Sequence, residues 1–197
     1  MKLMHGPHEH GPEEHLTGDR WKKADRVNKI SLAVNLILAV GKIFAGVVGK
    51  SAAMISDGIH TASDVLSTIV VMIGMFFSSK PEDESHPYGH ERIESAVAKI
   101  LAIMLGFTAF HLATDAVEKI ISGDYTTPTA IALAAAVISI VVKEWMYHYT
   151  MHTAKAINSE AMKADAWHHR SDAFSSIGTF IGIGGAMIGL PILDPIA

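Results

Sequence analysis

The stretch SDGIHTASDVLSTIVVMIG at residues 56–74 sets two aspartates and a histidine at the start of an otherwise apolar run. A second stretch, ADAWHHRSDAFSSIGTFIG at residues 164–182, repeats the pattern. Aligned residue by residue, the two stretches match Asp57 with Asp165, His60 with His168, and Asp64 with Asp172. Spacings of three and four residues bring side chains onto one face of an α-helix. The sequence therefore predicts two helices, each with one polar stripe on an apolar surface.

The rest of the chain indicates a membrane protein. Of its 197 residues 49% are hydrophobic and 18% charged, with a mean hydropathy of +0.28, whereas a soluble domain averages roughly 25% charged residues. Apolar spans that are long enough to cross a hydrocarbon core of about 30 Å run approximately over residues 30–49, 52–78, 93–121, 127–149 and 160–189. The sequence LDPIA at the end resembles the start of a sixth span. We expect an all-α, polytopic transmembrane bundle over residues 27–197, preceded by a polar, histidine-rich tail at 1–26.

The distribution of charge gives an orientation and excludes some partners. Lysine and arginine concentrate in the N-terminal segment and in the connections after the second and fourth spans, so the N-terminus is expected to be cytoplasmic. The tail lacks the early apolar core of a signal peptide. No basic patch interleaved with aromatic residues indicates nucleic-acid binding. The chain has no cysteine, so a metal site would have to use histidine, aspartate and glutamate.

The repeated stripe has the composition of a metal site. An aspartate in the middle of a membrane helix costs about 2.5–3.5 kcal/mol on insertion scales, and a bound divalent cation would offset that cost. The four residues predicted as ligands are His60, Asp64, His168 and Asp172. Two imidazoles and two carboxylates suit tetrahedral Zn²⁺, and Cd²⁺, Co²⁺ or Fe²⁺ fit the same donors. Asp57 and Asp165 are left over, and are predicted either to support the ligands or to line the ion pathway.

The motifs DGIHTASD, HPYGHERIES and ADAWHHRSD, in this order, resemble the cation diffusion facilitator family of the zinc and cadmium exporter type. The resemblance implies that His60, Asp64, His168 and Asp172 form the transport site. It also implies a second, cytoplasmic-side metal site at Asp83, His86 and His90. A member of this family would be a homodimer in a bacterial cell membrane. It would not be an enzyme, and would export metal in exchange for protons by alternating between inward-facing and outward-facing states.

Two alternatives stay open at this point. A helical-bundle metalloenzyme also builds metal sites from carboxylates and histidines on facing helices, but such sites use Glu-x-x-His signatures, whereas this stripe is based on aspartate. A truncated fragment that binds metal without transporting it is the other alternative. The family implies a complete sixth span and a cytoplasmic C-terminal domain beyond the last residue of this sequence.

Overall fold

The computed structural model describes residues 18–78, 92–123 and 125–197. Within these residues the chain forms the helices α1 (Gly18–Val48), α2 (Ala52–Ser78), α3 (Arg92–Ser122), α4 (Ala130–Ala156), α5 (Glu160–Met187) and the short α6 (Leu193–Ile196). The all-helical prediction is confirmed. The tail up to residue 17 and the predicted second metal site, Asp83, His86 and His90, lie outside the described residues.

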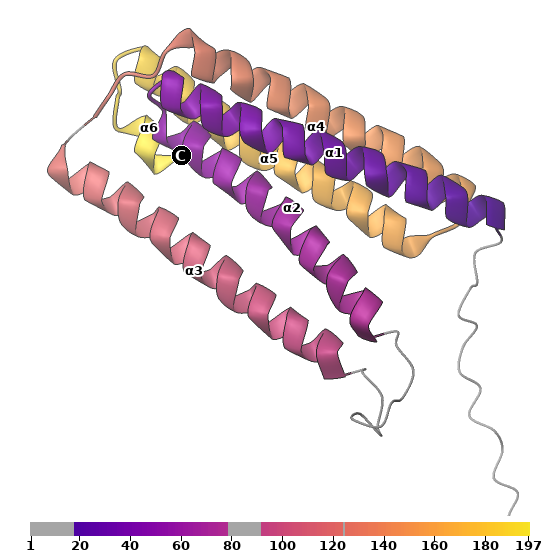
Figure 1. The fold of residues 1–197 in the computed structure, drawn as a ribbon. Helices are drawn as coiled ribbons and strands as arrows, with labels where there is room; N and C mark the ends of the chain where they lie inside the picture. Colours follow the sequence, from indigo (N-terminus) through magenta and orange to yellow (C-terminus); the bar gives the residue numbers. More distant parts are fainter. Residues whose placement is uncertain (1–17, 79–91, 124) are drawn as a thin grey trace, which may run out of the picture.

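Four of the long helices form a bundle, and the fifth lies beside it (Figure 1). Helix α4 packs along α5, and α1 packs against both α2 and α4. Helix α2 also contacts α5, which brings parts of the two polar stripes together. Helix α3 contacts α2 and α6 and is separated from the rest (Figure 1).

The first helix begins earlier than the sequence predicts. Its apolar span starts near residue 30, yet α1 starts at Gly18, so that residues 18–26 of the predicted tail are helical. The reason is a small apolar cluster, in which Ala24 and Val27 pack against the end of α4 and the start of α5. The partners in this cluster are Ala154, Ile157 and Met162. Tertiary packing of this kind stabilises helical turns whose own sequence is polar.

Large apolar side chains cover the outside of the bundle. Ile37, Phe107 and Ile121 have exposed fractions of 71%, 70% and 81%, while several lysines and aspartates are buried. Within the described residues, three segments are long and apolar enough to cross a membrane: Lys22–Val48, Lys99–Ser122 and Ala130–Ala156. Helices α2 and α5 carry the polar stripes instead. This inside-out distribution is typical of a helical membrane bundle.

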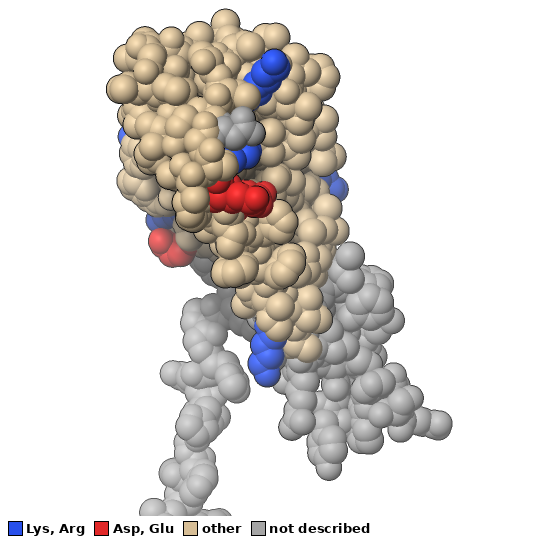
Figure 2. All heavy atoms as spheres, turned by 90° about the vertical axis from the view of Figure 1, so that its left-hand side faces the viewer, with Lys and Arg blue, Asp and Glu red and all other residues tan. Residues whose placement is uncertain are grey.

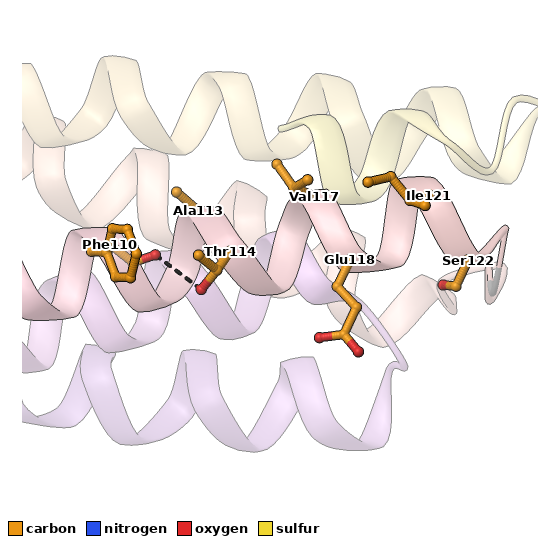
Figure 3. A pocket seen from close by; sticks show the side chains of 7 residues that line it. All are labelled: Phe110, Ala113, Thr114, Val117, Glu118, Ile121 and Ser122. Carbon is orange, nitrogen blue, oxygen red and sulfur yellow. Dashed lines mark hydrogen bonds between the residues drawn. The ribbon is translucent and has the colours of Figure 1, made fainter.

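The outer surface of α3 has a shallow apolar hollow of about 490 Å³ (Figure 3). All seven residues that line it belong to α3. Thr114 in the hollow donates a hydrogen bond to the carbonyl of Phe110 at 3.1 Å, and the Glu118 side chain points away from Val117 and Ile121 (Figure 3). With its polar groups satisfied or turned aside, this surface is suited to contact with lipid.

The end of the bundle that carries the α1–α2 turn and the α3–α4 connection is mainly uncharged (Figure 2). Lys50 and Lys119 are the only basic residues that the sequence has in or next to these two connections. The basic residues of the sequence concentrate toward the opposite end, at the start of α1 and around the α4–α5 connection.

Two contacts fix the position of α2. Gly58 lies against α1 so closely that a Cβ atom there would be 2.9 Å from the backbone nitrogen of Ile43. At the N-terminus of α2 the buried carboxylate of Asp194 accepts hydrogen bonds from the Ser51 hydroxyl and the Ala52 backbone nitrogen, both at 2.6 Å. A carboxylate at this place satisfies free backbone donors and interacts favourably with the helix dipole.

Candidate metal centre

Three side chains of the repeated stripes come together between α2 and α5. Ligand atoms of His60, Asp64 and Asp172 all lie within 4.8 Å of one another. His60 is exposed, Asp64 is half-buried and Asp172 is buried, so the group reaches from the surface into the bundle. Among the described residues the buried Asp64 Oδ2 atom has no hydrogen-bond partner. An unpaired buried carboxylate oxygen is costly unless a ligand binds it, and it suits a cation.

The fourth predicted ligand, His168, lies next to this group without belonging to it. Its Nδ1 atom is 3.9 Å from Asp172 Oδ1, and its side chain is 52% exposed. The spacing of four residues therefore places His168 on the same face as Asp172, as the sequence predicts. A change of side-chain rotamer would be needed to add its nitrogen to the other three ligands.

A lysine that the sequence analysis did not single out also reaches the centre. The side chain of Lys143, on α4, is fully buried. Its Nζ atom donates to Asp172 Oδ2 at 2.6 Å and to Asn35 Oδ1 at 2.8 Å. The signal in the sequence was a single lysine after the apolar run of residues 131–142, because ionisable residues inside a membrane span are usually functional and paired.

Asp57 takes part in a separate buried network with a second lysine. Lys42 Nζ lies 2.9 Å from Asp57 Oδ2, and both side chains are less than 5% exposed, at 2% and 4%. The hydroxyl of Ser176 donates to the same carboxylate oxygen at 3.1 Å, and Lys42 also donates to Thr61 and Ser176 at 3.1 and 3.3 Å. Asp57 therefore compensates a buried ammonium and joins α1, α2 and α5.

Asp165, the counterpart of Asp57 in the second stripe, has a different partner. Its Oδ2 atom lies 3.6 Å from Nε2 of His169, four residues further along α5. His169 is buried, with an exposed fraction of 2%, whereas the adjacent His168 is exposed. The two stripes match in sequence, but their first aspartates have different environments.

The centre combines groups that can exchange one cation for another. Its three clustered side chains offer one imidazole nitrogen and carboxylate oxygens, which bind divalent transition metals. The Lys143 Nζ atom already occupies one side of one of these carboxylates, so a metal that binds Asp172 through Oδ2 has to displace it.

A bundle with an apolar exterior and carboxylates, imidazole and ammonium groups inside is typical of a polytopic membrane protein that handles cations. The profile of the family described as the cation efflux transmembrane domain matches residues 29–197. The chain belongs to this cation efflux family, also called the cation diffusion facilitators, which are multi-pass membrane transporters and not enzymes.

Several curated proteins are similar to this chain. An uncharacterised transporter of Methanocaldococcus jannaschii is 44% identical over 85% of the chain and 59% of its own length. The manganese efflux system protein MneP of Bacillus subtilis is 38% identical over 88% of the chain and 58% of its own length. The magnetosome protein MamB of a Magnetospira species is 35% identical over 89% of the chain and 60% of its own length. The chain thus spans about three fifths of the length of these relatives.

Proposed function

We propose that this chain forms the transmembrane part of an exporter of divalent transition-metal cations. The observation that carries the proposal is the convergence of His60, Asp64 and Asp172 along a line from the surface of an apolar bundle into its interior. These residues come from two helices that both cross the bundle, so a relative movement of α2 and α5 would change the binding geometry. Alternating access needs this kind of coupling between a site and the helices that carry it.

Two separate arguments bear on which divalent cation is transported, and they favour different metals. Manganese is supported by the relatives, since two similar Bacillus subtilis proteins, MneP and MneS, are named manganese efflux system proteins. Zinc, which the sequence favours, is supported by the donor set that His60 and His168 would supply together with two carboxylates. We propose manganese as the first candidate, because the described cluster contains one imidazole and two carboxylates, a set richer in oxygen than zinc prefers.

Lys143 has a defined part in this proposal. In the metal-free protein its ammonium neutralises Asp172, which would otherwise be a buried, uncompensated charge. When the metal binds, it takes over that neutralisation and Lys143 withdraws, while Asn35 Oδ1 remains as an acceptor. Asp172 is then paired with a cation in both states: with the Lys143 ammonium before the metal binds, and with the metal afterwards.

The remaining features follow the family resemblance. We propose that the metal leaves in exchange for protons, because a histidine ligand has to be neutral to bind metal and protons compete for it. We also propose that the protein works as a homodimer in a bacterial cell membrane with a cytoplasmic N-terminus. The concentration of basic residues toward the end where α1 begins supports this orientation.

The test is metal binding and transport by the purified chain and one ligand variant. We expect Mn²⁺ to bind the wild-type chain in detergent micelles. We also expect Mn²⁺ to enter liposomes that carry the wild-type chain in their membrane and have an acidic interior. Asp64→Asn should abolish both. Asp115→Asn is the matched control, because Asp115 also faces a histidine four residues away, His111 at 3.2 Å, but lies exposed on α3. Running the same titrations with Zn²⁺ ranks the two metals.

Equal binding by the wild-type chain and Asp64→Asn would contradict the proposed centre. Binding without uptake would contradict transport by this chain and support the alternative of a metal-binding fragment.

A further inference from the structure

A second cavity, lined by polar as well as apolar side chains, lies toward the end of the bundle where α1 begins. It has a volume of about 390 Å³ and is lined by residues of α1, α2 and α5. Asp25 and Asn35 line it from α1, Thr68 from α2, and Asp165 and His169 from α5. We call this cavity the vestibule. By the distribution of basic residues it faces the side proposed to be cytoplasmic.

His169 is the unusual residue in the vestibule. It is 2% exposed, yet within the part of the chain that the structure describes neither of its ring nitrogens has a hydrogen-bond partner. Among the residues that the structure describes, its one ion-pair partner is Asp165, whose Oδ2 atom lies 3.6 Å from Nε2, beyond hydrogen-bond distance. Burying a polar ring without partners is costly. A bound cation that is coordinated by the imidazole nitrogen and the carboxylate oxygen together would offset this cost.

The vestibule is connected to the metal centre by a chain of direct contacts. Asn35 lines the vestibule and accepts a hydrogen bond from Lys143 at 2.8 Å. Lys143 in turn donates to Asp172 at 2.6 Å. Along α5 itself, Asp165 precedes Asp172 by two helical turns, roughly 10 Å. A cation in the vestibule would therefore be one step away from the centre, with Lys143 between the two positions.

We propose that Asp165 and His169 form a separate, weaker site for a divalent transition-metal cation in the vestibule, which loads the metal centre. The inference rests on the proposed function of the centre. One imidazole nitrogen and one carboxylate supply two protein ligands, and water completes the coordination. Asp25 is not counted as a ligand, because Lys29 already pairs with its Oδ2 atom at 2.7 Å. A site with so few protein ligands holds the cation briefly, which suits a position from which the metal moves on.

The site can be tested with Mn²⁺ alone, after the metal centre has been silenced. His60→Ala combined with Asp64→Asn removes two clustered ligands and leaves the Lys143–Asp172 pair intact. Electron paramagnetic resonance then counts the Mn²⁺ that the full chain binds. We expect a residual class of bound Mn²⁺ in this background, and at least a tenfold loss of its affinity when Asp165→Asn or His169→Asn is added.

The matched control is His148→Asn in the same background. His148 also faces a carboxylate four residues away, with Nε2 3.3 Å from Glu144 Oε1, but its side chain is 71% exposed. The substitution His148→Asn should leave the residual Mn²⁺ binding unchanged. The Asp165 side chain is 41% exposed, so Asp165→Asn should fold even if the buried substitution His169→Asn prevents folding. Circular dichroism of both variants establishes which of them are folded.

The outcomes separate this inference from the proposed function. If the double variant at the centre binds no Mn²⁺ while the wild-type chain does, the vestibule site is overturned and the centre stands. The vestibule site is also overturned if the residual binding is unchanged in folded Asp165→Asn. If the double variant binds as much Mn²⁺ as the wild-type chain and Asp165→Asn removes part of it, the vestibule site stands and the proposed centre fails.

Discussion

Replacing Lys143 by methionine should make metal binding tighter, although the lysine contacts no metal. Methionine keeps most of the volume of the side chain and removes its charge. The Lys143 Nζ atom lies 2.6 Å from Asp172 Oδ2, and a metal bound to that oxygen would be about 2.1 Å from it. Ammonium and metal would then be at most about 4.7 Å apart if neither moved.

The size of the effect follows from this geometry. A divalent metal ion and an ammonium group about 4.7 Å apart, at an effective dielectric constant of about 20, repel each other by roughly 7 kcal/mol, which is the cost if neither group moves. If Lys143 withdraws instead, the metal still has to break a charge-assisted hydrogen bond worth about 1.5–3 kcal/mol. Since about 1.4 kcal/mol corresponds to a factor of ten, Lys143→Met should bind Mn²⁺ at least about tenfold more tightly.

Stability should change in the opposite direction. Without metal, Lys143→Met leaves the buried Asp172 uncompensated, a loss of about 3–5 kcal/mol, and saturating metal should restore most of it. Lys42→Met is the matched control, because Lys42 is an equally buried lysine paired with Asp57, which lies outside the metal cluster. It should lower the unfolding temperature by a similar amount, without rescue by metal and without tighter binding.

The assays are isothermal titration with Mn²⁺ at pH 8, where protons compete least, and thermal unfolding followed by circular dichroism with and without metal. Unchanged or weaker Mn²⁺ binding by folded Lys143→Met would refute the role of Lys143 as a cation that the metal displaces. Equal rescue of both lysine variants by metal would refute it as well.

Three further substitutions test the packing that positions the centre, each by the thermal unfolding of the chain in detergent. Asp57→Asn should lower the free energy of unfolding by about 3–5 kcal/mol, because it leaves Lys42 buried and unpaired. Adding Lys42→Met should recover most of this loss. If stability does not recover, Asp57 and Lys42 do not act as a pair. Asp194→Ala removes both hydrogen bonds at the start of α2 and should cost about 1.5–3 kcal/mol, whereas Asp194→Asn, which keeps an acceptor, should cost less. Gly58→Val should push α1 from α2, since even a Cβ would be 2.8 Å from the Ile43 side chain, and should cost about 1–3 kcal/mol or more; a neutral result would show that the contact can relax.

Much of the fold could be predicted because it depends on local composition. The apolar spans near 52–78 and 160–189 coincide closely with α2, Ala52–Ser78, and α5, Glu160–Met187. Errors occurred at helix ends in the polar segments. The start of α1 at Gly18 depends on contacts of Ala24 and Val27 with distant residues, which no local pattern contains.

The candidate site was predictable in part for the same reason. Residues spaced by four in one helix share a face, so the pairing of His60 with Asp64, at 3.8 Å, follows from the sequence. The contact between the two stripes followed from their repetition and from the need to compensate buried carboxylates. The lysines were missed, because nothing in the local sequence states which helix faces Lys42 or Lys143.

The sequence by itself determined that this chain is a helical membrane bundle and that two of its helices each carry an acidic stripe, because helical periodicity and hydropathy are local properties. Only the tertiary structure decided which cation neutralises each carboxylate, Lys42 at Asp57 and Lys143 at Asp172. It also decided that His169 is buried and His168 exposed. Neighbouring residues on a helix point about 100° apart, and the rotation of each helix against its neighbours, set by packing across the whole bundle, determines which of them faces the interior.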